Sequence, residues 1–213
     1  MKLFVCLFLF LVPTLNYGFK KNVTPYSIVI SKAVLIVDGT ISKVFQNDYQ
    51  FTINEFVKGK SSPKINVTIW KEWICDPRIK ELKAGQRLIL FLEKSPNGNY
   101  YPINDSTGEL YVDKNAFIDI FLPKDFTNPT VLKKGISMFL ETYKCHGNLS
   151  DRFYSNMYFV RNKSIFEIYE MKMTNSSFAH LVDDAEYYRV TEFQQFQFIK
   201  NYSPNSKTAN SAG

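Results

Sequence analysis

Several stretches in the first half of the chain alternate apolar and polar residues. Residues 49–53 and 65–69 show the period of two that is typical of a half-buried β-strand. Residues 33–37 and 87–92 are instead almost continuously apolar, as in strands that are covered on both faces. We therefore expect five or six short strands, at residues 33–44, 49–57, 65–69, 87–92, 100–103 and 110–112.

Turn-forming residues separate these expected strands at short and regular intervals. Asn47 and Asp48 form one turn signal, and the Pro-Asn-Gly-Asn run at 96–99 predicts a hairpin. Gly39 lies inside the first long strand, where a glycine commonly marks a bulge or the bend of a barrel. This spacing of strands and turns favours a small barrel.

The second half of the chain has a different pattern. Thr127 and Asn128 precede Pro129, and these residue types are typical of a helix start. Apolar residues then recur at helical spacing over 132–143, and a second helix is expected at 182–200.

The remaining segments complete the expected architecture. Residues 25–32 predict a short helical turn, and residues 157–173 look strand-like or mixed. The fold class is therefore mainly β with α additions, and the extension is expected to pack on the barrel. The expected boundaries are a barrel at 19–122, a helical or mixed extension at 123–202 and a disordered polar tail at 203–213.

The first eighteen residues have the layout of a secretory signal peptide. Lys2 supplies a positive end, residues 3–12 are an unbroken apolar run, and Pro13 ends it before Gly18. The run is shorter than the ~20 residues of a comfortable membrane span, although an uncleaved anchor is the alternative. We expect removal of 1–18, no membrane contact after cleavage, and a secreted or extracytoplasmic protein, extracellular or periplasmic.

Composition and charge exclude several classes of protein. The chain is 45% hydrophobic and 22% charged, which excludes a disordered, collagen-like or coiled-coil chain. There are 26 basic and 20 acidic residues, so loss of Lys2 leaves 25 minus 20, or +5. The basic residues are scattered, so we expect no nucleic-acid partner.

Cysteine and histidine supply few candidates for chemistry. Cys75 and Cys145 are an even pair in an exported chain and predict a disulfide; two buried thiols are the alternative. A Cys145–His146 nucleophile is disfavoured, because neighbouring side chains diverge. Acids at 183, 184 and 186 lie near His180, but acidic residues are also common in the first turn of a helix. We expect no enzyme, no metal and no cofactor.

The chain also contains seven Asn-x-Ser/Thr sequons, more than its composition predicts. They suit a eukaryotic secretory glycoprotein, and an Asn- and Lys-rich bacterial composition is the alternative. The sequons begin at Asn22, Asn66, Asn104, Asn148, Asn162, Asn175 and Asn201.

The expected strand region resembles the OB-type barrel of the netrin-like modules and the tissue inhibitors of metalloproteinases. The resemblance rests on the strand with Gly39, the 49–59 strand ending in Val-Lys-Gly, the lone Cys75, the 85–92 strand and the Asn-Gly hairpin at 97–98. It implies a five- or six-stranded OB-type barrel. The inhibitors chelate zinc through an N-terminal cysteine, and the expected mature N-terminus, residues 19–21, contains none.

Two functions follow from this reading. The first is a secreted non-enzymatic binding module for an unknown extracellular protein or glycan, with ligand contacts expected from Trp70, Trp73, Tyr100 and Tyr101. The alternative, implied by the resemblance alone, is a metalloprotease-inhibitor-like protein that acts without N-terminal chelation.

Overall fold

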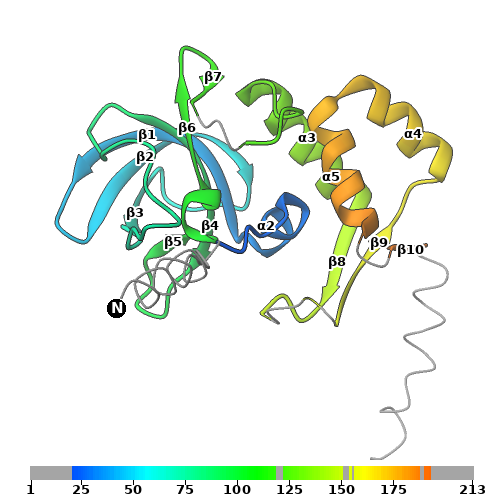
Figure 1. Ribbon diagram of the computed structural model, residues 1–213, viewed down its shortest axis with the longest axis horizontal. Helices are drawn as coiled ribbons and strands as arrows, with labels where there is room; N and C mark the ends of the chain where they lie inside the picture. The colour runs from blue at the N-terminus through cyan, green and yellow to red at the C-terminus, as the bar shows by residue number, and fades with distance from the viewer. Residues whose placement is uncertain (1–20, 119–121, 151–153, 155, 188–189, 193–213) are drawn as a thin grey trace, which may run out of the picture.

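The computed structural model describes residues 21–118, 122–150, 154, 156–187 and 190–192 (Figure 1). The expected signal peptide at 1–18 and the expected tail at 203–213 lie outside the described residues. Among the described residues, no helix combines the length and apolar character needed to cross a membrane.

The first half of the chain forms a closed five-stranded β-barrel, which confirms the expected fold class. The strand order is β1-β2-β3-β5-β4, and β4 pairs back with β1 to close the barrel. All neighbours are antiparallel except β3 and β5, which are parallel. Two further strands, β6 and β7, extend the sheet from β4. The strands are β1 (Leu35–Val44), β2 (Asp48–Lys58), β3 (Lys64–Thr68), β4 (Arg87–Lys94), β5 (Tyr100–Pro102), β6 (Glu109–Asp113) and β7 (Ala116–Phe117).

Gly39 allows β1 to bend and pair with strands on both sides. The register against β2 shifts between Asp38 and Gly39, as the sequence predicted for a bulge. A Cβ at this position would lie 2.2 Å from the carbonyl oxygen of Thr52 and 2.7 Å from the ring of Phe51. A larger residue at position 39 therefore has no room against the paired strand β2.

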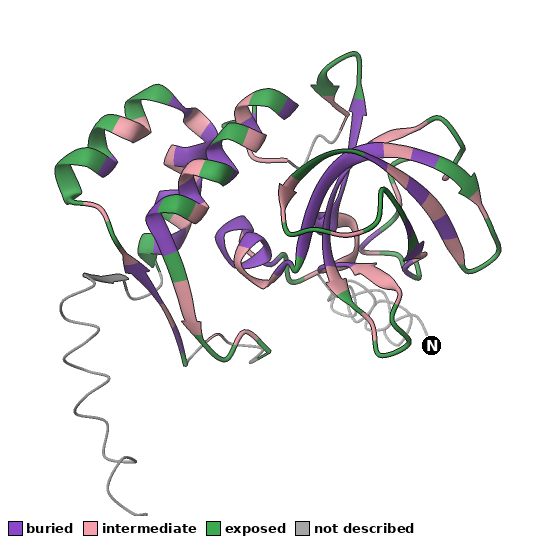
Figure 2. Cartoon of the chain, turned by 180° about the vertical axis from the view of Figure 1, so that it is seen from behind, coloured by how far each residue is buried: buried purple, intermediate pink, exposed green. Residues whose placement is uncertain are grey.

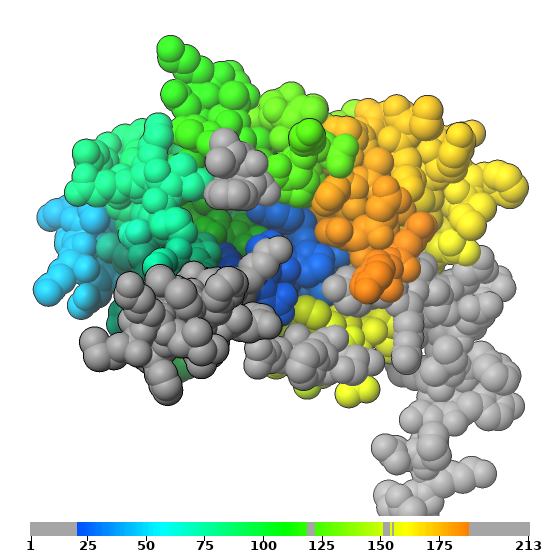
Figure 3. All heavy atoms as spheres, viewed as in Figure 1, coloured from blue at the N-terminus to red at the C-terminus, as the bar shows by residue number. Residues whose placement is uncertain are grey.

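The second half of the chain forms a helical lobe beside the barrel. Its helices pack around a small sheet with the order β10-β9-β8. A short helix, α2, lies between the barrel strands and α5 (Figure 3). The elements are α2 (Tyr26–Lys32), α3 (Pro129–Thr142), β8 (Tyr143–Gly147), β9 (Met157–Arg161), α4 (Ile165–Thr174), α5 (Ser176–Tyr187) and β10 (Val190–Glu192).

The helix starts follow local capping rules, and one of them corrects an expectation. The side chain of Asn128 accepts the backbone N–H of Val131, so α3 begins where the sequence predicted. Residues 165–173, expected as strand-like or mixed, belong to the helix α4. Ser164 and Glu167 form a reciprocal capping box at its start. Local capping thus favours a helix here over the strand that the apolar run indicates.

The second expected helix also differs from the structure. It was expected at 182–200, whereas α5 spans Ser176–Tyr187, and residues 193–200 lie outside the described residues. The start is earlier because the side chain of Asn175 accepts the N–H of Phe178 and donates to the carbonyl of Val131. A Cβ on Gly135 would lie 2.8 Å from both Asn175 Oδ1 and the Phe178 nitrogen. This glycine therefore lets α3 and α5 approach closely.

The predicted disulfide between Cys75 and Cys145 is absent from this structure. Cys75 lies in the connection between β3 and β4, Cys145 lies on β8, and no disulfide joins them. Burial raises the pKa of the Cys145 thiol to about 11, against the opposing effects of Ser31 and Lys58. Such a thiol stays protonated near neutral pH and is a poor nucleophile. An even number of cysteines in a sequence does not indicate whether the fold places two of them close enough to bond.

Candidate functional site

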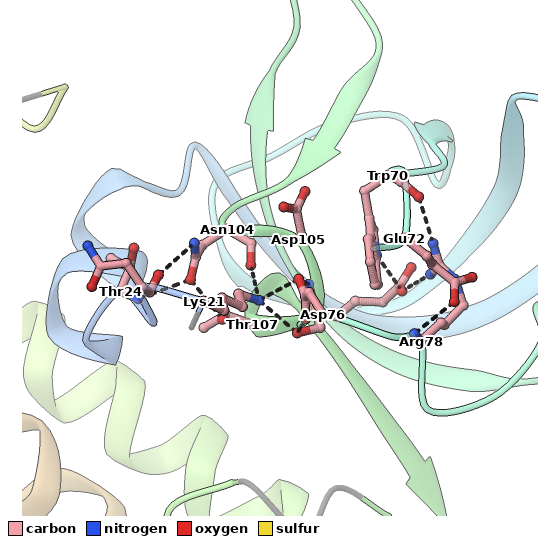
Figure 4. Close-up of polar contacts among 12 residues, drawn as sticks. Lys21, Thr24, Trp70, Glu72, Asp76, Arg78, Asn104, Asp105 and Thr107 are labelled. Carbon is pink, nitrogen blue, oxygen red and sulfur yellow. Dashed lines mark hydrogen bonds and ion pairs between the residues drawn. The ribbon is translucent and has the colours of Figure 1, made fainter. Parts of the chain in front are cut away.

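Three separate segments meet at one end of the barrel. They are the N-terminal residues 21–24, the 18-residue connection 69–86 between β3 and β4, and the 3₁₀ helix η2 (Asp105–Gly108) between β5 and β6 (Figure 4). The 69–86 connection, all of which is described, forms no helix or strand beyond an isolated bridge between Trp73 and Asp76. Connections of this length without regular structure are commonly functional.

A buried carboxylate attaches this connection to the inside of the barrel. Glu109 on β6 is 1% exposed and accepts hydrogen bonds from the hydroxyl of Tyr49 (2.8 Å) and the indole nitrogen of Trp70 (2.9 Å). Nη1 of Arg78 completes the set as an ion pair, and the guanidinium lies 4.2 Å from the centre of the Trp70 ring. We call these four residues the Glu109 cluster. Pairing compensates the cost of burying both charges.

Burial dominates the electrostatics of the Glu109 cluster. It raises the pKa of Glu109, and the charge of Arg78 together with the bonds from Trp70 and Tyr49 only partly oppose it. Burial and the neighbouring carboxylate raise the pKa of Tyr49 as well, so its hydroxyl remains a donor. The four side chains of the cluster thus satisfy one another's hydrogen bonds and charges inside the barrel.

A second cluster connects the N-terminal segment to the same connection. Nζ of Lys21 lies 2.7 Å from Asp76 Oδ2 and donates to the Ser106 hydroxyl and to the Asn104 carbonyl, both at 2.8 Å. Ser106 in turn donates to Asp76. We call these four residues the Asp76 cluster. The side chains of Lys21 and Asp76 are only 11% and 5% exposed, so the pair is shielded from solvent.

Asn104 joins the N-terminal segment to η2 through its amide. Its oxygen accepts the backbone N–H of Thr24 (3.0 Å), and its nitrogen donates to the carbonyl of Asn22 (3.2 Å). Asn104 has φ of 54°, in the left-handed region that asparagine tolerates better than most residues. The sequon at Asn104 thus begins at an amide that the fold already uses, as does the sequon at Asn175.

The connection presents three apolar side chains to solvent, of which Trp73 and Ile74 lie on one turn between Trp70 and Asp76. Trp73 is 41% exposed, Ile74 is 93% exposed and Ile79 is 37% exposed. The nitrogen of Asp76 donates to the carbonyl of Trp73 at 2.9 Å, which closes the turn that carries Ile74. Large apolar residues are thus exposed on a turn whose two flanks are fixed, by Trp70 in the Glu109 cluster on one side and by the ion pair of Asp76 on the other.

The four expected contact residues have different environments. Trp70 is 2% exposed and belongs to the Glu109 cluster, so its ring is not presented to a ligand. Trp73 is exposed, as the expected role requires. Tyr100 and Tyr101 are half-buried on β5, and the hydroxyl of Tyr101 donates to Asp105 at 2.6 Å.

The residues that organise this end were missed by sequence reasoning. Lys21, Asp76, Arg78 and Glu109 are isolated charges in the sequence and match no motif. Their partners lie up to 85 positions away along the chain, as for Lys21 and Ser106. Only the closure of the barrel brings them together.

The acids near His180 have structural partners. His180 Nδ1 lies 3.0 Å from Asp125, Asp183 pairs with Lys172, and Asp184 accepts backbone N–H groups at the start of α2. Within the described part of the chain, no group of three or more histidine, cysteine or acidic residues is arranged to hold a metal ion.

Comparison with known proteins adds no family to this description. No protein-family model matches the chain, and the search of curated proteins finds no match. The chain is therefore described by its fold, a closed five-stranded barrel with two added strands and a helical lobe.

Proposed function

We propose that this protein is an exported, non-enzymatic binding module that recognises a protein partner through the 69–86 connection. The observation that carries the proposal is the exposure of Trp73 and Ile74 on a turn between Trp70, which is held in the Glu109 cluster, and Asp76, which is held in a buried ion pair. Aromatic and large apolar side chains at the centre of a contact supply most of the binding energy in protein interfaces.

The fixed flanks favour binding because less order must be imposed when the partner arrives. Trp70 is attached to Glu109 inside the barrel, and Asp76 is attached to Lys21. A loop already held in one conformation loses less entropy on binding than a mobile loop. The buried clusters thus support the apolar turn without contacting the partner themselves.

The chemistry of the turn favours a protein over a glycan. A tryptophan ring can stack on a sugar, but Ile74 is aliphatic, 93% exposed and offers no hydrogen bond to hydroxyl groups. Exposed Lys71 and Glu72 stand next to Trp73 and supply a charged rim of both signs. An apolar centre with a polar rim is the usual composition of a protein–protein contact.

The residue order at the N-terminus supports export with cleavage near Gly18. Such cleavage retains Lys21, whose ammonium group forms the buried pair with Asp76. N-terminal sequencing of the exported protein tests this part of the proposal. A mature chain that begins after Lys21 would contradict it, because the Asp76 carboxylate would lose its cation.

The binding proposal is tested with matched surface variants. Extracellular proteins from the source cells are passed over the immobilised wild-type chain, and any retained partner is purified and titrated. We expect the Trp73→Ser, Ile74→Ser double variant to weaken binding about thirtyfold, the effect of losing about 2 kcal/mol at a hot spot. Phe45→Ser is the control, since Phe45 is 43% exposed on the barrel but lies outside the connection.

Three outcomes would reject the proposal. Equal binding by the double variant and the wild type would show that the 69–86 connection does not contact the partner. Equal loss in the Phe45→Ser control would indicate nonspecific adhesion through apolar groups. Retention on a glycan array that depends on Trp73 would replace the protein partner with a glycan. The inhibitor-like alternative stays a prediction, and a panel of secreted metalloproteases incubated with the chain tests it.

A further inference from the structure

Six of the seven sequons begin in the described part of the chain, and the structure separates them into two groups. The groups differ at the amide nitrogen of the asparagine, which is the atom that carries the sugar in an N-linked glycan. In the free sequons the asparagine is exposed and its nitrogen donates no hydrogen bond to another described residue. In the bonded sequons the nitrogen donates to a backbone carbonyl. The free sequons begin at Asn22, Asn66 and Asn148, and the bonded sequons begin at Asn104, Asn162 and Asn175.

The side chain of Asn66 points out of the barrel. Asn66 lies on β3 between Ile65 and Val67, whose side chains are 5% and 0% exposed. Successive residues of a strand point to opposite faces of the sheet, and Asn66 itself is exposed. A sugar on its nitrogen would therefore extend into solvent and displace no contact inside the barrel.

The other two free sequons also keep the nitrogen out of the fold. Asn148 follows β8, and its side-chain oxygen accepts the N–H of Ser150 at 2.9 Å, so the bond orients the amide through its oxygen. At Asn22 the fold uses the backbone carbonyl, which accepts from Asn104. Each asparagine is exposed and has room for a sugar on its nitrogen.

Asn175 is the opposite case, because its amide is packed between two helices. It is 5% exposed, and its nitrogen donates to the carbonyl of Val131 on α3 at 3.0 Å. Figure 2 shows buried residues on both α3 and α5, which pack against each other. A Cβ on Gly135 would already lie 2.8 Å from Asn175 Oδ1, so a sugar ring has no room. A chain with a sugar on Asn175 cannot pack α3 on α5.

Asn104 and Asn162 lie nearer the surface, but the fold uses their nitrogens. Asn104 donates to the carbonyl of Asn22 at 3.2 Å, and Asn162 donates to the carbonyl of Glu141 at 2.8 Å. A sugar takes the place of one of the two hydrogens on the nitrogen and brings a ring next to the acceptor. Modification would therefore crowd or remove a hydrogen bond that the fold makes.

We propose that the free sequons carry N-linked glycans in the exported chain and that the bonded sequons stay unmodified. The donor is an oligosaccharide on a polyprenyl diphosphate. The amide nitrogen attacks the anomeric carbon of the sugar, and a carbon–nitrogen bond forms as the bond from that carbon to the diphosphate oxygen breaks. The nitrogen loses one proton, and polyprenyl diphosphate leaves.

Two further points support this assignment. The chain has more sequons than its composition predicts, which favours their use over chance. Transfer during export can precede folding, but cells remove chains that fold poorly, so the exported molecules are selected against sugar at the bonded sequons. The inference rests on the export that is part of the proposed function, and not on the role of the 69–86 connection.

Site mapping of the full exported chain, recovered from the medium of the source cells, tests the inference. Peptide-N-glycosidase in heavy-oxygen water converts each glycosylated asparagine to a labelled aspartate, which mass spectrometry locates. We expect label at the three free sequons and none at the bonded sequons. Label on Asn175, or equal label in the two groups, would overturn the inference.

Variants that remove one sequon at a time give a second measurement. Thr68→Ala and Ser150→Ala are each expected to lose one glycan, seen as a gain in gel mobility that disappears after deglycosylation. Thr68→Ser retains the sequon and is the matched control, with unchanged mobility. Ser177→Ala removes the sequon of Asn175 and is also expected to leave the mobility unchanged. Wild-type mobility in both Thr68→Ala and Ser150→Ala would overturn the inference.

These measurements distinguish failure of the glycan inference from failure of export. A chain in the medium that carries no sugar would overturn the inference and leave the export proposal standing. A chain that stays in the cytosol would reject export and the glycans together.

Discussion

The Glu109 cluster and a further charge cluster around Asp38 both contain a buried carboxylate, but the pKa values of the two carboxylates shift in opposite directions. Their cations also differ in exposure: the side chain of Arg78 is 3% exposed, whereas Arg87 and Lys133 at Asp38 are 34% and 13% exposed. In the Glu109 cluster the carboxylate is fully enclosed, and burial raises its pKa in spite of Arg78. At Asp38 on β1, burial also acts to raise the pKa, but the bonds and charges of Arg87 and Lys133 outweigh it, so the net direction is down. Each carboxylate is paired with a base, yet the pKa is raised at Glu109 and lowered at Asp38.

The two clusters also connect different parts of the molecule. Arg87 contacts Asp38 with two bonds, from Nε at 2.9 Å and Nη2 at 2.8 Å, and Lys133 on α3 lies 2.7 Å from the same carboxylate. Lys133 also pairs with Glu55 on β2, which completes the Asp38 cluster. The Glu109 cluster connects a surface loop to the barrel interior, whereas the Asp38 cluster connects the helical lobe to the barrel wall.

The largest effect is expected from breaking the deeper cluster. Arg78→Ala leaves the Glu109 carboxylate buried without its cation, and loss of one partner of a buried pair typically costs about 3–5 kcal/mol. Urea unfolding measures the loss in the free energy of unfolding. An Arg78→Met, Glu109→Gln double variant is the control and should be less destabilised than Arg78→Ala, since no buried charge remains and the amide oxygen can still accept from Tyr49 or Trp70. If the double variant were as unstable as the single variant, the loss in the free energy of unfolding would come from packing and not from a buried charge.

A smaller effect is expected at the junction of barrel and lobe. Lys133→Ala removes one of two cations from Asp38, and Arg87 remains, so we expect a loss of about 1 kcal/mol. The loss should shrink in ~0.5 M salt, because Glu55 and Arg87 are partly exposed and salt screens exposed charges. The Arg78→Ala loss, measured in the same way, should change little with salt. If salt reduced the loss of stability equally in the two variants, the charges of the two clusters would not differ in their exposure to solvent.

The smallest effect is expected in the pH dependence of stability. The folded-state pKa of Asp38 is lowered, so its ionised form stabilises the fold above the ordinary carboxyl pKa of about 4, and this contribution is lost as the pH falls through the lowered value. An Asp38→Asn variant should therefore be less stable than the wild type near neutral pH, and the gap should narrow in acid. If the difference in stability between the wild type and the variant widened below about pH 4, the folded-state pKa of Asp38 would be raised instead of lowered.

The apolar pattern of the sequence was sufficient to predict most of the fold. The alternation over residues 49–53 and the glycine at 39 predicted the strand and the bend that the barrel contains. Asn128 and Pro129 predicted the start of α3 because capping depends on neighbours within a few residues. At α4 the local signal conflicted with the apolar run, and the capping box of Ser164 and Glu167 proved the better guide.

The candidate site could be predicted only in part. Trp70 and Trp73 are the same residue type three positions apart, and their sequence context gave them the same expected role. Trp70 is buried because Glu109, 39 positions away, accepts its indole N–H, and Trp73 is exposed on the neighbouring turn. Nothing in the local sequence distinguishes these two outcomes.

The sequence by itself determined the strands of the barrel, the bend at Gly39 and the first helix of the lobe, because each depends on periodicity or contacts within one short segment. Only the tertiary structure decided which charges are buried, which tryptophan is exposed and that Cys75 and Cys145 are not joined. Those outcomes depend on residues brought together by barrel closure from distant parts of the chain, as with Lys21 and Asp76. The physical reason is that burial and pairing belong to the packed fold, whereas periodicity and capping belong to the segment.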